Sequence, residues 1–145
     1  MTRHQPLRVT PMPLQPPAVI VAACACAMSA GVHAALVPEH LHESAALGAA
    51  FMLAVAALVA AVAALVSRPE DRAVAEVVAV LLAALIVSWA ASRSTGIPAL
   101  HPHPEAIDAV GAVTKLVEAL GLACAIWQSQ QPGGRRSPSI QEEPR

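Results

Sequence analysis

Aromatic and charged residues are scarce in this sequence. Its 145 residues include one phenylalanine, two tryptophans and no tyrosine, and only 13% of the residues are charged. A soluble domain of this length needs a more polar surface, so a water-soluble domain built around a core is excluded. Strands favour aromatic and β-branched side chains, whereas the apolar excess here lies in small helix-forming side chains. An all-β membrane barrel is therefore excluded as well.

Basic clusters, paired cysteines and catalytic motifs are also lacking. The net charge is -1 and no block of lysine or arginine occurs, which argues against nucleic acid as a partner. The three cysteines, Cys24, Cys26 and Cys124, fall inside apolar stretches and predict no disulfide framework. The sequence contains no glycine-rich phosphate loop, nucleophile elbow or zinc-protease motif, so we expect no enzyme activity.

Apolar residues make up 56% of the chain, and alanine alone supplies 33 of the 145 positions. A helix that spans a bilayer needs about 20 apolar residues. Four stretches meet or approach that length, at residues 18–37, 45–66, 73–91 and 107–127. Pro38 and Pro104 each precede a glutamate and suit the first turn of a helix, so the predicted helices cover 18–37, 38–66, 73–91 and 105–127. The sequence thus predicts an all-α fold, a four-transmembrane-helix bundle in the lipid bilayer.

Both ends of the chain differ from the apolar stretches. Residues 1–17 contain five prolines, and residues 128–145 read QSQQPGGRRSPSIQEEPR. Such segments have little apolar surface to bury. We therefore expect a disordered N-terminal segment at 1–17, a membrane domain at 18–127 and a disordered C-terminal tail at 128–145.

Basic residues near the helix ends predict the orientation. Seven arginines belong to the two termini and the connection between the second and third helices, whereas the other two connections hold only Arg93. Because cytoplasmic loops are enriched in positive charge, we expect both termini of a multi-pass plasma-membrane protein to lie in the cytoplasm. A signal peptide cleaved before Cys24 is the alternative, but the apolar run ahead of Cys24 is short and the apolar pattern continues to Val37.

Histidines gather on the predicted outer side. Five of the six lie in or beside the two outer connections, together with several carboxylates. Imidazole and carboxylate groups bind zinc and copper. The candidate metal ligands are His33, Glu39, His40, Glu43, His101 and His103. Two other interpretations stay open, polar capping of helix ends and proton-linked sensing through histidine, because none of the spacings is a diagnostic metal motif.

The fourth helix carries charges inside its apolar stretch. Lys115 and Glu118 are three residues apart and can pair on one face, and Asp108 lies two turns earlier on that face. Each charge at mid-membrane costs about 2.5 to 3.5 kcal/mol on insertion scales. We therefore predict a buried polar stripe that faces the bundle interior, where Glu76 could join it. The stripe could serve as an ion or proton path, but a buried pair that fixes the register of the helices is the favoured interpretation.

Three short motifs carry a resemblance to other proteins. The segment HAALVPEHLHESAALGAAF at 33–51, STGIP at 94–98 and TKLVE at 114–118 resemble a group of small, functionally uncharacterised four-helix integral membrane proteins of bacteria. The resemblance implies the same architecture in a bacterial plasma membrane, and it supplies no activity. It also implies a shared polar feature made of His33, Glu39, His40, Glu43, Lys115 and Glu118.

Two functions follow as hypotheses. One is binding or handling of zinc or copper at the outer histidine and carboxylate cluster. The other is a non-enzymatic accessory or assembly subunit of a membrane complex. The second predicted helix offers ridges of small residues for close helix packing, which suits a homo-oligomer or another membrane protein as partner. These ridges consist of Ala46, Ala50 and Ala54, and of Ala56, Ala60 and Ala64.

Overall fold

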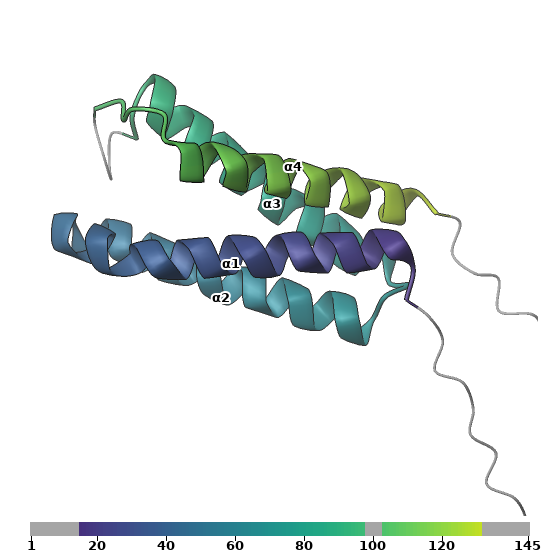
Figure 1. Cartoon of the computed structure of the whole chain (residues 1–145). Coiled ribbons are helices and arrows are strands. Elements are labelled where there is room, and N and C mark those ends of the chain that lie inside the picture. The colour runs from purple at the N-terminus through teal and green to yellow at the C-terminus, as the bar shows by residue number, and fades with distance from the viewer. Residues whose placement is uncertain (1–14, 98–102, 132–145) are drawn as a thin grey trace, which may run out of the picture.

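The structure, a computed structural model, describes residues 15–97 and 103–131. Within those residues the chain forms four helices, which confirms the all-α prediction (Figure 1). They are α1 (Pro17–Glu43), α2 (Ala45–Ser67), α3 (Arg72–Ser94) and α4 (Ala109–Gln130). Each of the four is long and apolar enough to cross a membrane.

The first two helices meet at a boundary that differs from the predicted one. The predicted start of the second helix at Pro38 is wrong, because α1 continues through Pro38 to Glu43. Ser44 then adopts an extended conformation, and its hydroxyl accepts a hydrogen bond from the Leu47 backbone nitrogen, so Ser44 is the N-cap of α2. Leu41 lies so close to α2 that a Cβ at Gly48 would overlap its side chain. This contact packs the last turn of α1, which follows Pro38, against α2.

The last helix also begins later than predicted. The predicted start at 105 is wrong, because α4 begins at Ala109. Asp108 is its N-cap and accepts a 2.6 Å hydrogen bond from the Gly111 backbone nitrogen. Glu105 instead belongs to the α3–α4 connection, where its backbone nitrogen donates to the Ser92 carbonyl and its carboxylate pairs with Arg93.

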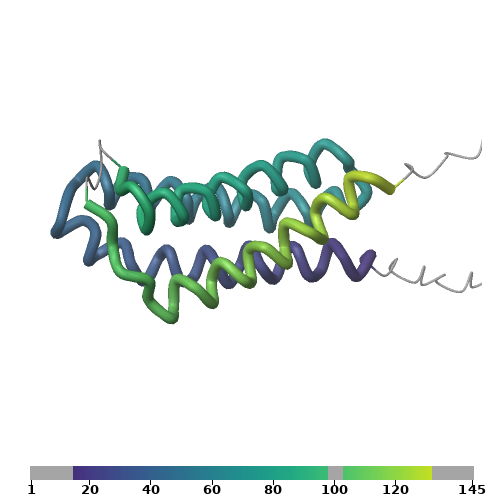
Figure 2. The backbone as a smooth tube through the Cα atoms, turned by 90° about the horizontal axis from the view of Figure 1, so that it is seen from above, coloured from purple at the N-terminus to yellow at the C-terminus, as the bar shows by residue number. Residues whose placement is uncertain are grey.

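The four helices form two antiparallel hairpins, α1–α2 and α3–α4, which meet chiefly where α1 packs against α4 (Figure 2). The terminal end of the bundle carries the start of α1, the 68–71 connection and the end of α4. The distal end carries the α1–α2 junction and the α3–α4 connection. The core between the helices is mostly small and aliphatic, and it includes Val19, Ala22, Cys26, Leu58, Leu65, Leu82 and Ala125.

Two hydrogen bonds tie the ends of the helical region to the last turn of α2 and to the 68–71 connection. Gln15 Nε2 donates to the Val66 carbonyl at 3.1 Å, and Gln128 Nε2 donates to the Pro69 carbonyl at 3.0 Å. The segments predicted to be disordered fall mostly on residues 1–14 and 132–145, which lie outside the described residues. Within the predicted tail, residues 128–130 are the last residues of α4.

Candidate functional site

A charged side chain lies fully inside the bundle. Glu118 of α4 has 0% of its surface exposed. Its Oε1 accepts a 2.6 Å hydrogen bond from the Ser29 hydroxyl of α1, and its Oε2 accepts one of 2.6 Å from Lys115 Nζ. Both carboxylate oxygens are therefore satisfied, one across the α1–α4 interface and one along α4.

The energetics of this group depend on its depth. Ser29 and Glu118 lie near the middle of two helices that are each long enough to span a bilayer. In a bilayer, a lone charge at the middle of such a helix would cost about 2.5 to 3.5 kcal/mol on insertion scales. The pairing of Lys115 with Glu118 would lower this cost, whereas loss of one partner would leave an uncompensated buried charge.

His33 extends the network toward the distal end. Its Nδ1 lies 2.9 Å from the Ser29 carbonyl oxygen and 3.3 Å from the Ser29 hydroxyl. Because a carbonyl can only accept, the 2.9 Å contact requires the proton on Nδ1. Ser29 is thus the residue that links His33 to Glu118, and it is not among the site residues predicted from the sequence. Its spacing of four residues from His33, which puts both on one helix face, was the available signal.

Phe51 of α2 lies between the two predicted histidine ligands of α1. The Phe51 ring centroid is 5.4 Å from that of His33 and 4.0 Å from that of His40, the second contact being edge-on. His40 Nδ1 is buried without a hydrogen-bond partner and lies 3.6 Å from a Glu43 carboxylate oxygen. The structure therefore brings His40 close to Glu43, while His33 turns toward Ser29.

The other predicted metal ligands do not complete a cluster around this pair within the described residues. Glu39 is exposed on α1, and His103 is exposed on the α3–α4 connection. His101 lies outside the described residues. Across 15–97 and 103–131, no three histidine, cysteine, aspartate or glutamate side chains group closely enough to hold a metal ion.

Asp108 and Glu76 do not join Lys115 and Glu118. Asp108 precedes α4, so its helical spacing from Lys115 does not put the two residues on one face. Its carboxylate pairs with Arg93 at 3.0 Å instead. Glu76 forms an exposed 2.7 Å ion pair with Arg72 on α3. The polar stripe predicted along α4 thus consists of the Lys115–Glu118 pair alone at this depth.

A second polar cluster occupies the distal end of the α3–α4 hairpin. Arg93 pairs with both Glu105 and Asp108, and its guanidinium carbon lies 5.8 Å from the centre of the Trp89 ring. Gly111 makes room for this arrangement, since a Cβ there would lie 2.8 Å from Asp108 Oδ2 and 2.9 Å from Trp89 Nε1. The cluster fixes the α3–α4 connection to the end of α3.

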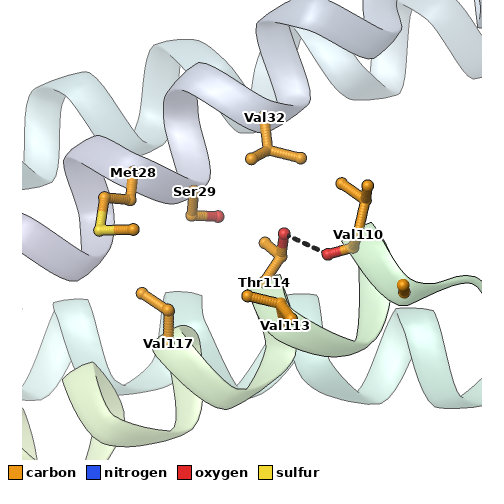
Figure 3. Close-up of a pocket in the computed structure, with 8 residues that line it drawn as sticks. Met28, Ser29, Val32, Val110, Val113, Thr114 and Val117 are labelled. Atoms are coloured by element: carbon orange, nitrogen blue, oxygen red, sulfur yellow. Dashed lines mark hydrogen bonds between the residues drawn. The ribbon is translucent and has the colours of Figure 1, made fainter.

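A groove of about 330 Å³ runs between α1 and α4 beside the buried network (Figure 3). Its walls are almost entirely apolar, and Ser29 and Thr114 supply the hydroxyl groups. The Thr114 hydroxyl donates a 2.7 Å hydrogen bond to the Val110 carbonyl. The complete lining is Met28, Ser29, Val32, Ala109, Val110, Val113, Thr114 and Val117.

No known protein family, curated protein or solved structure matches this chain.

Proposed function

We propose that this chain is a multi-pass protein of the bacterial plasma membrane, with both termini and the 68–71 connection in the cytoplasm. Four helices of spanning length support membrane insertion. The hydrogen bonds from Gln15 and Gln128 hold both ends of the helical region beside the 68–71 connection, and the basic residues of the sequence concentrate in these same segments. Reporter domains fused to either terminus should be protected from externally added protease in spheroplasts. Cleavage of such a reporter in intact spheroplasts would contradict this orientation.

Within that membrane, the chain acts as a non-enzymatic accessory or assembly subunit. The observation that carries this proposal is the outward face of α2. Only 17% of the α2 span is buried within the chain, and Ala46, Ala50, Ala56 and Ala60 are exposed on it. Small residues let helix backbones approach closely in lipid. The face therefore suits a partner helix, from a second copy or from another membrane protein.

The test is the state of the protein after gentle extraction. We expect a complex larger than one chain, measured by size-exclusion chromatography with light scattering. Ala60→Leu should weaken the complex, because the larger side chain holds the partner helix away. Val80→Leu on α3, where Val80 is 70% exposed, is the matched control and should leave the complex intact. A single chain under the mildest extraction conditions, or equal effects of both substitutions, would contradict the proposal.

A second candidate function is binding of zinc or copper at the distal end. The buried, unpartnered Nδ1 of His40, 3.6 Å from Glu43, supports it, since imidazole and carboxylate are ligands for both metals. Elemental analysis of the purified protein should then find stoichiometric metal, lost in the His40→Ala, Glu43→Ala double variant. His42→Ala, at an exposed position on the same helix end, is the control and should keep the metal. Metal content that is the same in all three proteins would rule out this site.

A further inference from the structure

The groove between α1 and α4 leads from the distal end toward Glu118. Its lining begins at Ala109, the first residue of α4, beside the ion-paired Asp108. It continues along α4 to Val117, the neighbour of Glu118 in the chain. Figure 3 shows the Ser29 side chain directed toward the space between the two helices. The Ser29 hydroxyl that lines the groove is thus the same group that donates a hydrogen bond to the Glu118 carboxylate.

The same two helices close together on the other side of Glu118. Gly121 lies about one turn further along α4, and a Cβ there would lie 2.6 Å from the Ala25 Cβ and 3.2 Å from Leu82 Cδ1. Toward the terminal end, Ala22, Val19 and Ala125 are each only 1% exposed. Glu118 therefore lies where an open half of the α1–α4 interface meets a closed half.

The charged and titratable groups that face Glu118 come from two helices. Lys115 of α4 pairs with it directly. From α1, the Cys26 thiol is near enough to interact with it electrostatically, and His33 is connected to it through Ser29. The helices α2 and α3 contribute apolar groups to the adjoining core, including Leu58 and Leu82.

We propose that Glu118 is a reversible proton-binding site that is reached from the distal end alone, through the α1–α4 groove. Water occupies roughly 30 Å³ per molecule in the liquid, so a groove of about 330 Å³ has room for a short file of water beside the Thr114 hydroxyl. Ser29 lines the inner wall and is 0% exposed, so side chains of the lining must move for water to reach its Oγ. An incoming proton binds Ser29 Oγ while the original hydroxyl proton moves to Glu118 Oε1. The carboxylate becomes a carboxylic acid, and the pair with Lys115 changes from neutral to a net charge of +1.

This proposal rests on the membrane insertion proposed above and requires neither a partner subunit nor a metal. The first test uses the purified full chain in lipid nanodiscs and dicyclohexylcarbodiimide, which is soluble in lipid. This reagent adds to a protonated carboxyl group to give an O-acylisourea. The adduct then rearranges to a stable N-acylurea, so that no group leaves. Peptide mass spectrometry should find the adduct on Glu118, in a yield that rises as the solution is acidified. The adduct should be absent from Glu118→Gln and form faster at neutral pH in Lys115→Gln, which lacks the neighbouring cation.

Infrared difference spectroscopy on the same samples detects protonation without a reagent. Acidification should produce the C=O stretching band of a carboxylic acid, and Glu118→Gln should lose that band. An infrared band and an adduct that both persist in Glu118→Gln would overturn the proposal, and so would the absence of both from the unsubstituted protein.

The second test addresses access from one side. Val113 lines the groove and is 59% exposed, whereas Leu116 lies outside the groove on α4 and is 72% exposed. A charged, membrane-impermeant thiol reagent should modify Val113→Cys when it is added on the distal side, and should leave Leu116→Cys unmodified. Peptide-resolved analysis separates these sites from the native cysteines, and flotation with membranes checks insertion of both variants separately. If inserted Val113→Cys does not react, the groove is dry or filled with lipid and the access path is wrong.

Discussion

Ser29 on α1 donates a 2.6 Å hydrogen bond to Glu118 on α4, and this contact joins the two hairpins of the bundle through a fully buried carboxylate. The two residues are 89 positions apart in the chain. Lys115 donates a hydrogen bond to the other Glu118 carboxylate oxygen. The Ser29–Glu118 contact therefore couples the packing of α1 against α4 to the stability of the Lys115–Glu118 ion pair. The hydrogen bond therefore contributes both to helix register and to the burial of charge.

Removal of the Ser29 hydroxyl should destabilise the protein. In Ser29→Ala, Glu118 Oε1 would lose its hydrogen bond at a fully buried position, which typically costs about 1 to 3 kcal/mol. The measurement is the free energy of unfolding in mixed micelles titrated with a denaturing detergent. Ser88→Ala is the control, because Ser88 is exposed on α3 and should tolerate the change. Equal stability of the two variants would show that the Ser29 contact contributes nothing.

Lys115 and Glu118 should behave as a coupled pair. Lys115→Met and Glu118→Met should each cost about 3 to 5 kcal/mol, because each leaves one buried charge unpaired. The double variant should lose far less stability than the sum of the two single variants, since it removes both charges and keeps the apolar volume, and the remaining loss is that of the Ser29 hydrogen bond. The same unfolding titration, arranged as a double-mutant cycle, measures the coupling. Additive effects of the two substitutions would contradict the ion pair.

The spans and the Lys115–Glu118 pair could be predicted because both depend on local spacing. An apolar run of spanning length can be recognised without knowing which helices pack against it. Residues three apart on a helix share a face wherever that helix packs. Ser29 could not be identified as a partner of Glu118 in this way. That contact depends on which helix packs against α4, and the sequence alone leaves this open.

The misplaced boundaries have a related cause. Pro38 and Glu105 both resemble helix starts when their neighbours in the sequence are considered alone. Ser44 is instead the N-cap of α2, and α1 passes through Pro38 to a last turn that packs against α2 through Leu41. Arg93, at the end of α3, pairs with Glu105 and Asp108. The pair with Arg93 keeps Glu105 in the α3–α4 connection. Contacts between helices thus overrode a local preference at both places.

Gly111 and Gly31 should respond in opposite ways to the same substitution. In Gly111→Ala the new Cβ would meet Asp108 Oδ2 at 2.8 Å and Trp89 Nε1 at 2.9 Å, so the distal cluster must shift. Overpacking of this kind typically costs about 1 to 3 kcal/mol. A Cβ added at Gly31 would meet no atom within 4 Å. Gly31→Ala should therefore be neutral or should stabilise α1 by up to about 1 kcal/mol. Thermal unfolding in detergent measures both, and a loss of similar size in the two variants would contradict this account.

Gly121 should tolerate no larger side chain at the α1–α4 interface. In Gly121→Ala the added Cβ would lie 2.6 Å from the Ala25 Cβ, so α1 and α4 must move apart. The expected loss is about 1 to 3 kcal/mol, because neither methyl group can rotate out of the contact. Ala123→Leu is the control, since Ala123 is exposed on the same helix and has room for the added atoms. The unfolding titration should separate the two variants clearly. A tolerated Gly121→Ala would mean that α1 and α4 do not pack closely at this point, and the closed half of the interface next to Glu118 would then lack its basis.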